Sequence, residues 1–265
     1  MTKKKKHPQG VEQFADSHNT QANATPQEQC TTTGECGILD FGFYLMDCMD
    51  GMKRFPDKYF ELAIVDPPYG GVGRGGYMYN KAGGGKGRHP NNYVLDLWKQ
   101  EAPSVDYFNE LFRVSQNQII WGGNYFVEQI AKNSQCWLVW DKQRGDGIGF
   151  ADVELAWTSF NVGSRIFRFK WNGMLQEDMK NKEVRIHPTQ KPVALYNWCL
   201  GRFAKPGDKI LDTHVGSASS LIACHDLGFK YVGFEISEKY YEMAKERLDA
   251  YKAQLSLFDG GWFDV

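Results

Sequence analysis

The sequence contains no C-x-x-C pair, although it has six cysteines. They are scattered over the chain, at Cys30, Cys36, Cys48, Cys136, Cys199 and Cys224. Cysteines paired at short spacing mark most zinc ribbons and small disulfide scaffolds, so both kinds of protein are disfavoured. Scattered cysteines are typical of a reducing compartment. We therefore expect a cytoplasmic protein and assign no metal site.

Long apolar runs and a strong net charge are absent too. No stretch of about 18 consecutive apolar residues occurs, so the sequence predicts no membrane span. The lysines near the N-terminus are not followed by an apolar segment, so we expect no secretory signal. The net charge is -1, so the charge of the whole chain does not indicate any class of binding partner. A length of 265 residues suits one large α/β domain or two small ones.

Glycine-rich nucleotide motifs are missing where they would indicate a phosphate site. The chain has no G-x-x-x-x-G-K-[ST] spacing, which argues against a phosphate-cradling P-loop. The turn between the strands predicted at 209–212 and 231–235 lacks G-x-G-x-x-G, the fingerprint of dinucleotide-binding Rossmann units, and keeps only Gly216. These absences favour a ligand that has no phosphate groups.

The most informative stretch that is present begins with an apolar run, Leu62 to Val65, and ends in Asp66-Pro67-Pro68-Tyr69. The run predicts a buried strand of a parallel sheet. The prolines fix a stiff turn after it, which holds a carboxylate and an aromatic ring at the carboxyl end of the strand. The Asp66 carboxylate and the Pro67 carbonyl suit an amine, and the ring suits the face of a planar heterocycle.

A second set of strand-end acids lies elsewhere in the chain. Asp47 follows the strand predicted at 41–45, and taken alone it is more typical of a turn or a helix N-cap than of a ligand-binding residue. Asp212 ends the strand predicted at 209–212, and Glu235 ends the strand predicted at 231–235. Between them the turn with Gly216 and Ser217 lets a ligand approach the backbone, and a terminal carboxylate can bind a ribose diol. S-adenosylmethionine fits this half better than a nicotinamide dinucleotide, which remains the competing interpretation.

The tetrapeptide Asp66-Pro67-Pro68-Tyr69 resembles the catalytic motif of the DNA amino-methyltransferases, which modify exocyclic amines of bases. The resemblance covers roughly residues 38–250 and has the beta-type motif order. It implies a bacterial or phage enzyme of a restriction-modification type, and S-adenosylmethionine as the cofactor. It also implies a Rossmann-like α/β methyltransferase fold, with a mostly parallel seven-stranded sheet and an antiparallel hairpin at the edge. We expect that hairpin at 153–160 and 165–171.

The resemblance assigns roles to these residues. The catalytic group is Asp66, Pro67, Pro68 and Tyr69, acting on adenine N6, with cytosine N4 as the alternative acceptor. The cofactor group is Asp47, Cys48, His187, Thr189, Lys191, Asp212, His214, Gly216, Ser217 and Glu235. The Asp212 turn departs from the family pattern Asp-Pro-Phe-x-Gly-Ser-Gly-Thr at four positions, which are Thr213, His214, Ala218 and Ser219. A donor-binding protein without catalysis is the alternative from another class.

A glycine-rich segment follows the first motif at 70–92. Nine glycines fall between Gly70 and Gly87, and no acid occurs before Asp96. Basic and aromatic residues without acids suit a surface that tracks a nucleic-acid backbone, and a disordered surface loop is the simpler alternative. We assign contacts with double-stranded DNA to Arg74, Tyr77, Lys81, Lys86 and Arg88.

The predicted organisation has three parts. Residues 1–37 form a polar, basic tail that buries too little apolar surface to order itself. Residues 38–252 form one catalytic domain, with a mobile connection at 172–186. Residues 253–265 form a tail in which Gln254 to Phe258 resembles the peptide that docks on the bacterial sliding clamp. Packing of that segment on its own domain is the alternative. We expect a monomer or a homodimer.

Overall fold

The computed structural model describes residues 37–70, 101–144, 151–172 and 175–259. The residues from Ile38 onward form one compact unit. Its main sheet has eight strands in the order β1-β10-β9-β2-β3-β5-β4-β6. Their bounds are β1 (Gly42–Leu45), β2 (Phe60–Val65), β3 (Ser115–Trp121), β4 (Trp137–Asp141), β5 (Val153–Thr158), β6 (Arg165–Arg168), β9 (Lys209–Asp212) and β10 (Lys230–Glu235).

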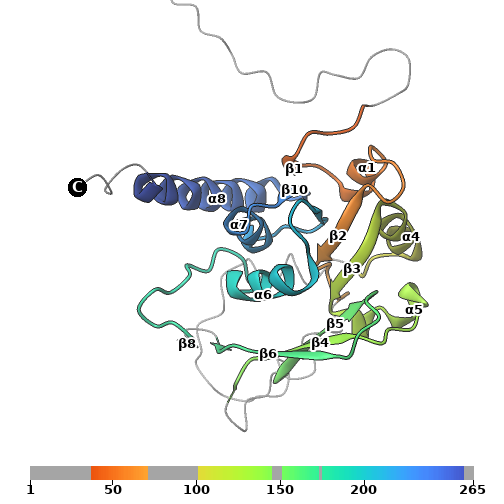
Figure 1. Ribbon diagram of the computed structural model, residues 1–265, viewed down its shortest axis with the longest axis horizontal. Helices are drawn as coiled ribbons and strands as arrows, with labels where there is room; N and C mark the ends of the chain where they lie inside the picture. Colours follow the sequence, from red (N-terminus) through yellow and green to blue (C-terminus); the bar gives the residue numbers. More distant parts are fainter. Residues whose placement is uncertain (1–36, 71–100, 145–150, 173–174, 260–265) are drawn as a thin grey trace, which may run out of the picture. The chain divides into compact units, whose positions relative to one another are not determined.

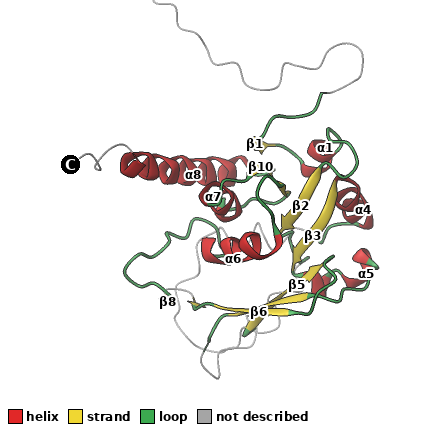
Figure 2. Cartoon of the chain, viewed as in Figure 1, coloured by secondary structure: helices red, strands yellow, loops and turns green. Residues whose placement is uncertain are grey.

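Helices cover both faces of this sheet (Figures 1 and 2). One face carries α1 (Cys48–Met52), α4 (Val105–Val114), the 3-10 helix η2 (Gly123–Tyr125) and α5 (Val127–Ile130). The other face carries α6 (Val193–Phe203) and α7 (Ser219–Asp226), and α8 (Glu238–Asp259) packs beside α7. Two short strands, β7 (Trp171–Asn172) and β8 (Leu175–Gln176), pair separately.

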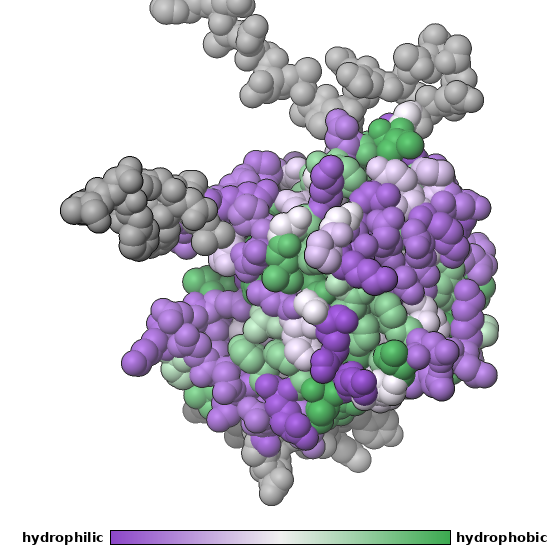
Figure 3. Space-filling view, in the orientation of Figure 1, coloured by the Kyte–Doolittle hydropathy of each residue, from purple (hydrophilic) through white to green (hydrophobic). Residues whose placement is uncertain are grey.

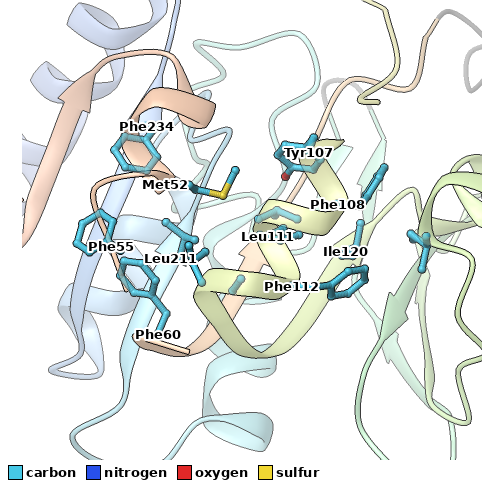
Figure 4. Packing of buried hydrophobic residues seen from close by; sticks show 14 of the residues in the cluster. Met52, Phe55, Phe60, Tyr107, Phe108, Leu111, Phe112, Ile120, Leu211 and Phe234 are labelled. Carbon is cyan, nitrogen blue, oxygen red and sulfur yellow. The ribbon is translucent and has the colours of Figure 1, made fainter. Parts of the chain in front are cut away.

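The alternation of side chains along β2 explains why both faces are covered. Ala63 and Val65 point into a core with the α1 and α4 residues, and Figure 4 shows Leu111 and Phe112 of α4 in that core. Leu62 and Ile64 point into the second core with α6 and α7. A parallel strand that is buried on both faces needs apolar side chains at every position, as the Leu62–Val65 run has.

The centre of the sheet is its topological switch point. β2 pairs in parallel with β3 on one side and with β9 on the other. Ala63 lies opposite Leu211, so Asp66 and Asp212 follow adjacent strands at the same edge of the sheet. Ligand sites of open α/β sheets form at such a point, outside the carboxyl ends of the strands.

The predicted fold class is confirmed, but the strand count and the hairpin are wrong. The sheet has eight strands, and β5 and β6 are not neighbours, because β4 lies between them. β5 is antiparallel to β3 and β4, whereas β6 is parallel to β4. Alternation identified the strands, but it carries no information on which strand is the neighbour.

The sequence also predicts helix N-caps at Ser104 and Thr189 and a last helix that ends near Gln254, and two of these three boundaries differ in the structure. The N-cap of α6 is Pro192 and not Thr189, because the Thr189 hydroxyl is bonded to His187 Nδ1 instead. Ser104 occupies the N-cap position of α4 without a side-chain hydrogen bond. α8 continues through Asp259, beyond the expected end at Gln254, so the backbone of residues 254–258 is helical and not extended. Binding of this segment to a sliding clamp stays a prediction.

The part of the predicted connection at 172–186 that the structure describes is tied to the domain. Glu183 Oε1 accepts a hydrogen bond from the backbone N–H of Val193 at 2.9 Å, and Glu183 Oε2 pairs with Arg247 at 2.7 Å.

On the face in Figure 3, polar residues surround smaller apolar areas. Within the described residues, no helix combines the length and the apolar character that crossing a membrane requires.

Candidate active site

The Asp66 carboxylate lies at the end of β2 with its side chain 14% exposed. Its Oδ1 accepts a hydrogen bond from the Tyr69 hydroxyl at 2.7 Å. Its Oδ2 accepts one from Lys191 Nζ at 2.5 Å. Both oxygens are therefore already oriented, and each keeps a second lone-pair direction for another donor. We call Asp66, Tyr69, Lys191 and Glu154 the Asp66 pocket.

The Tyr69 ring is held by aromatic neighbours that the sequence did not identify. It stacks on Tyr125 with ring centroids 5.1 Å apart and meets Phe126 edge-on at 5.9 Å. It also lies against Gly122, whose φ is 72° and where a Cβ would come within 2.2 Å of the ring. A glycine is needed there for both reasons, since it tolerates the positive φ and leaves space for the ring.

A buried cluster of charges surrounds Asp66. Lys191 is 3% exposed at its side chain, and its ammonium also pairs with Glu154 Oε2 at 3.0 Å. Glu154 Oε1 accepts a hydrogen bond from Lys142. Burial would lower the pKa of Lys191, but the charges of Asp66 and Glu154 outweigh it and raise that pKa above its usual value. Burial would raise the pKa of Glu154, and the two lysines outweigh it and lower that pKa to about 2.

Two members of this cluster, Lys142 and Glu154, were missed from the sequence, and Lys191 was assigned elsewhere. We expected Lys191 in the cofactor site, whereas its ammonium lies on Asp66. The signal for Glu154 was available, because a carboxylate interrupts the otherwise apolar run Val153 to Trp157. A charge in a strand of this kind is rarely buried without a partner.

The sequence places the strand that ends at Trp121 and the turn with Asn124 toward the same edge of the sheet, so both residues are candidates to line a site for the base, with core packing of Trp121 as the alternative. The two side chains differ in exposure. Trp121 is fully buried in the second core, and Asn124 is exposed. Among the described residues, Trp121 Nε1 has no hydrogen-bond partner. The packing alternative therefore describes Trp121.

The Asp212 turn, residues 212–219, follows β9 and leads into α7. The Asp212 carboxylate is 2% exposed and accepts hydrogen bonds from Ser220 Oγ at 2.5 Å and from the His214 backbone N–H at 2.9 Å. No ion pair joins Asp212 to any residue that the structure describes. Burial raises the pKa of Asp212 to about 7, because neutral donors only partly replace water around its charge.

The departures from the family pattern form a hydrogen-bonded chain of their own. The Thr213 hydroxyl lies 2.6 Å from the Tyr107 hydroxyl and 2.9 Å from His214 Nδ1. The Tyr107 and His214 rings meet edge-on at 5.4 Å. Burial lowers the pKa of His214 to about 4, so the ring is neutral at pH 7. This placement agrees with His214 standing where the family has an aromatic side chain.

Ala218 is strained, because it has a φ of 62° where the family usually has glycine. Gly216 lies in the same turn with a φ of 56°, which glycine adopts without strain. A Cβ at this position would lie 3.7 Å from the His187 ring. His187 in turn meets Tyr240 edge-on at 4.4 Å. The Ser217 hydroxyl lies 3.1 Å from that of Ser219.

Glu235 ends β10, which lies beside β9, and Asp47 follows β1, which lies beside β10. Glu235 Oε2 accepts the Gly216 backbone N–H at 3.0 Å, and Oε1 accepts that of Ser237 at 2.9 Å. Asp47 is the N-cap of α1 and accepts the Met49 backbone N–H at 2.7 Å, as expected from its position alone. Cys48 is partly buried, and burial raises the pKa of its thiol to about 12. Neither a nucleophile nor a redox role is indicated for that thiol.

The structure thus gathers the sequence-predicted residues into two neighbouring groups. Asp66, Pro67, Pro68, Tyr69 and Lys191 lie around the end of β2. The other nine form the group around β9, β10 and β1, namely Asp47, Cys48, His187, Thr189, Asp212, His214, Gly216, Ser217 and Glu235. The residues assigned to DNA, Arg74, Tyr77, Lys81, Lys86 and Arg88, lie outside the described residues.

The sheet order and the switch point define a protein with the fold of the S-adenosylmethionine-dependent methyltransferases. The crystal structure of the M1.HpyAVI–SAM complex matches with a TM-score of 0.51 and 18% identity, over 78% of this chain and 98% of that one. PvuII DNA methyltransferase, described as cytosine-N4-specific, matches with a TM-score of 0.52 and 11% identity, over 83% and 93%. At these identities the likeness shows the fold alone.

The sequence comparisons identify the family. The family model described as DNA methylase matches residues 92–246, which is more than half of the chain, and the chain belongs to this family. Type II methyltransferase M.HpaI of Haemophilus parainfluenzae is 44% identical over 70 residues, 26% of this chain and 22% of the relative. Type II methyltransferase M.HinfI of Haemophilus influenzae is 24% identical over 244 residues, 76% and 66% respectively. The match therefore spans less than two thirds of either relative.

Proposed function

We propose that this protein transfers a methyl group from S-adenosylmethionine to the exocyclic N6 amine of adenine in double-stranded DNA. The observation that carries this proposal is the register of β2 and β9, which brings the Asp66 pocket and the Asp212 turn to adjacent strand ends. One group is suited to an amine on a planar base, and the other to the methyl donor. Two substrates held at neighbouring strand ends can react directly.

The side chains around the Asp212 turn fit the donor chemically. The adenine amine, the ribose diol and the ammonium group of the donor all donate hydrogen bonds, and carboxylates end three neighbouring strands, at Asp47, Glu235 and Asp212. Each Glu235 oxygen accepts one backbone N–H and keeps lone-pair capacity for the diol. By resemblance Asp47 would hold the adenine amine. The bound donor would supply an electrophilic methyl group on its sulfonium.

The Asp66 pocket would act on the acceptor amine. The base must leave the duplex to present that amine. The Tyr69 ring would stack on the base, while the Asp66 carboxylate and the Pro67 carbonyl accept the two amine hydrogens. These hydrogen bonds would direct the nitrogen lone pair toward the methyl group. The N–C bond would form as the S–C bond of the donor breaks, so the donor leaves as its neutral sulfide, and the amine would lose one of its hydrogen-bonded protons through Asp66 to water. Positioning and electrostatics then carry the rate, without a covalent intermediate on the protein.

A variant at Asp66 tests this assignment. The full-length protein and Asp66→Ala are incubated with unmethylated bacterial genomic DNA and S-adenosylmethionine, and the nucleosides are analysed by mass spectrometry. We expect N6-methyladenine with the wild type, none with Asp66→Ala, and donor binding by calorimetry in both. Retained turnover in Asp66→Ala contradicts the assignment of Asp66.

The same measurement separates the alternatives. N4-methylcytosine as the product would show that cytosine is the acceptor. We expect this outcome less than N6-methyladenine, because the first motif position is an Asp. Donor binding without any methylated nucleoside would favour a donor-binding module that does not catalyse transfer. Such a module has no need for the oriented carboxylate and ring of the Asp66 pocket.

Binding to a sliding clamp is a separate proposal. It rests on the sequence from Gln254 to Phe258, which the structure places within α8. A pull-down with a bacterial clamp compares the wild type with Leu257→Ala/Phe258→Ala. Equal capture of both proteins, or of neither, contradicts a role for this segment.

A further inference from the structure

Four charged side chains meet beneath the proposed amine site, and they come from four separate parts of the chain. Asp66 follows β2, Lys142 follows β4, Glu154 is the second residue of β5, and Lys191 precedes α6. Lys191 Nζ lies 2.5 Å from Asp66 Oδ2, 3.0 Å from Glu154 Oε2 and 3.1 Å from the Tyr69 hydroxyl. A single ammonium therefore contacts both the carboxylate and the ring residue that are proposed to hold the base.

We propose that Lys191 is a positioning residue that fixes the Asp66 carboxylate and the Tyr69 hydroxyl for the acceptor amine, and that Glu154 is a positioning residue that acts through Lys191. This inference deepens the proposed function and rests on it. It assigns to Lys191 a place on the acceptor side of the reaction, in contrast to the donor side that the sequence suggested.

The geometry favours Asp66 as the point of action. Lys191 and Tyr69 occupy one direction at each Asp66 oxygen and so fix the plane of the carboxylate. The remaining lone-pair directions are then fixed as well, which is what an acceptor for an amine hydrogen requires. Hydrogen bonds between an ammonium and a carboxylate are about twice as strong as neutral ones, so the carboxylate is held firmly.

Glu154 is placed to hold the ammonium. Its Oε2 forms an ion pair with Lys191 Nζ at 3.0 Å, while its Oε1 accepts a hydrogen bond from Lys142. Two carboxylates and two ammonium groups give the cluster no net charge, which is the condition under which buried charges are tolerated. Without the Glu154 charge, Lys191 keeps one carboxylate partner and the cluster carries an excess positive charge.

Nothing in the cluster touches the Asp212 turn through a hydrogen bond or an ion pair between described residues. Asp212 is bonded to Ser220 and His214, and Glu235 to backbone N–H groups. A change at Glu154 should therefore affect the acceptor side and leave donor binding as it is. This separation distinguishes positioning from a general contribution to stability.

The pH dependence offers a second readout. Among the residues that the structure describes, the titratable side chains that interact with the Lys191 ammonium are Asp66, Glu154, Lys142 and Tyr69. Two of them, Asp66 and Glu154, raise the pKa of Lys191 through their charges. Loss of the Glu154 charge should lower that pKa, so the ammonium loses its proton at a lower pH.

The test compares Glu154→Gln, Glu154→Asp and a matched control, Glu61→Gln. Glu61 is also a carboxylate of the sheet that pairs with a lysine, Lys209, and its side chain is 28% exposed against 24% for Glu154. Turnover on unmethylated genomic DNA is measured from pH 6 to pH 10, which lies below the ordinary pKa of lysine, about 10.4, so the Lys191 ammonium of the wild type should stay protonated throughout. The Kd of S-adenosylmethionine and the Tm are measured for each protein.

We expect Glu154→Gln to lower kcat by about 10- to 100-fold, to change the Kd of S-adenosylmethionine less than about twofold, and to show within this pH range an alkaline fall of kcat that the wild type lacks. Glu154→Asp, which keeps the charge, should recover part of kcat, and Glu61→Gln should keep it. An unchanged kcat and pH profile in folded Glu154→Gln overturns the inference, as does an equal loss of kcat in Glu61→Gln.

A second variant covers the case in which Glu154→Gln does not fold. The double variant Glu154→Gln/Lys142→Met removes one charge of each sign and keeps the Asp66–Lys191 pair. It should fold and still show the lowered kcat and the shifted pH profile; wild-type kinetics in it overturn the inference. A wild type that methylates no DNA contradicts the proposed function itself, whereas an active wild type with an equally active Glu154→Gln contradicts only this inference.

Discussion

Asp66 and Asp212 stand at the ends of adjacent strands of one sheet, yet one carboxylate has a cation beside it and the other does not. Asp66 is paired with the Lys191 ammonium, which is paired in turn with Glu154. Asp212 is surrounded by neutral donors, and its pKa rises to about 7. The comparison shows that position at a strand end does not set the charge state of a carboxylate. Side chains from distant parts of the chain set it.

The largest effect should come from removing the cation of the Asp66 pocket. Lys191→Met leaves Asp66 and Glu154 near each other without their shared partner. Breaking a buried pair in this way costs about 3–5 kcal/mol of unfolding free energy. Urea unfolding measures the loss, and turnover should fall with it. Lys209→Met is the control, since its pair with Glu61 is more exposed and should cost less. Equal losses in both would remove the distinction between the two sites.

The next effect concerns the ring of the Asp66 pocket. Gly122→Ala places a Cβ within 2.2 Å of the Tyr69 ring at a φ of 72°, so the ring has to move. We expect a loss of turnover of about tenfold or more, corresponding to at least about 1.4 kcal/mol of activation free energy. Gly207→Ala has a similar positive φ of 92° and nothing within 4 Å of the new Cβ. It should lose stability but keep its turnover, and a matching loss in both variants would assign the effect to backbone strain alone.

The Asp212 turn should respond to pH rather than to the loss of a partner. The pKa of Asp212 rises from 3.8 to about 7, so between these pH values the folded state binds a proton that the unfolded state has lost. Stability from this group is therefore present at low pH and lost as the pH rises toward 7. Asp212→Asn cannot ionise and should lose less stability between pH 5 and pH 8, by up to about 1.4 kcal/mol for each pKa unit. Urea unfolding at both pH values checks this, and parallel pH curves for the two proteins would contradict it.

The smallest effect should be a gain in stability at Ala218. Its φ of 62° is unfavourable for a residue with a Cβ, and Ala218→Gly should relieve this strain by up to about 1 kcal/mol. The matched control is Ala223→Gly, in the interior of α7, where glycine should cost about 1 kcal/mol. Thermal and urea unfolding of the two variants should move in opposite directions. A loss in both would mean that the turn is not strained.

Much of the fold and part of the site could be predicted from the sequence. The strands that end in Asp66, Asp212 and Glu235 were found because their apolar runs stop abruptly at a carboxylate. The pairing of β5 with β3 and β4 could not be predicted, because alternation along a strand is the same for any neighbour. The end of α8 was also misplaced, since the chain continues to form helix past Gln254.

The site shows the same division. The sequence identified the Asp66 carboxylate and the Tyr69 ring, because two prolines between them force a rigid turn. It did not identify Lys191 as the partner of Asp66, which is 125 positions away in the chain. The sequence also did not identify Glu154, since a single acid in an apolar strand does not indicate which cation it pairs with in the folded protein.

The sequence by itself determined which side chains stand at the ends of the strands, because local apolar runs, prolines and glycines fix where each strand stops. The tertiary structure alone decided which of those carboxylates has a cation beside it. The energy of a buried charge depends on side chains within a few ångströms, and in this protein those side chains come from β2, β4, β5 and the segment before α6. Only the folded sheet brings these segments to the same place.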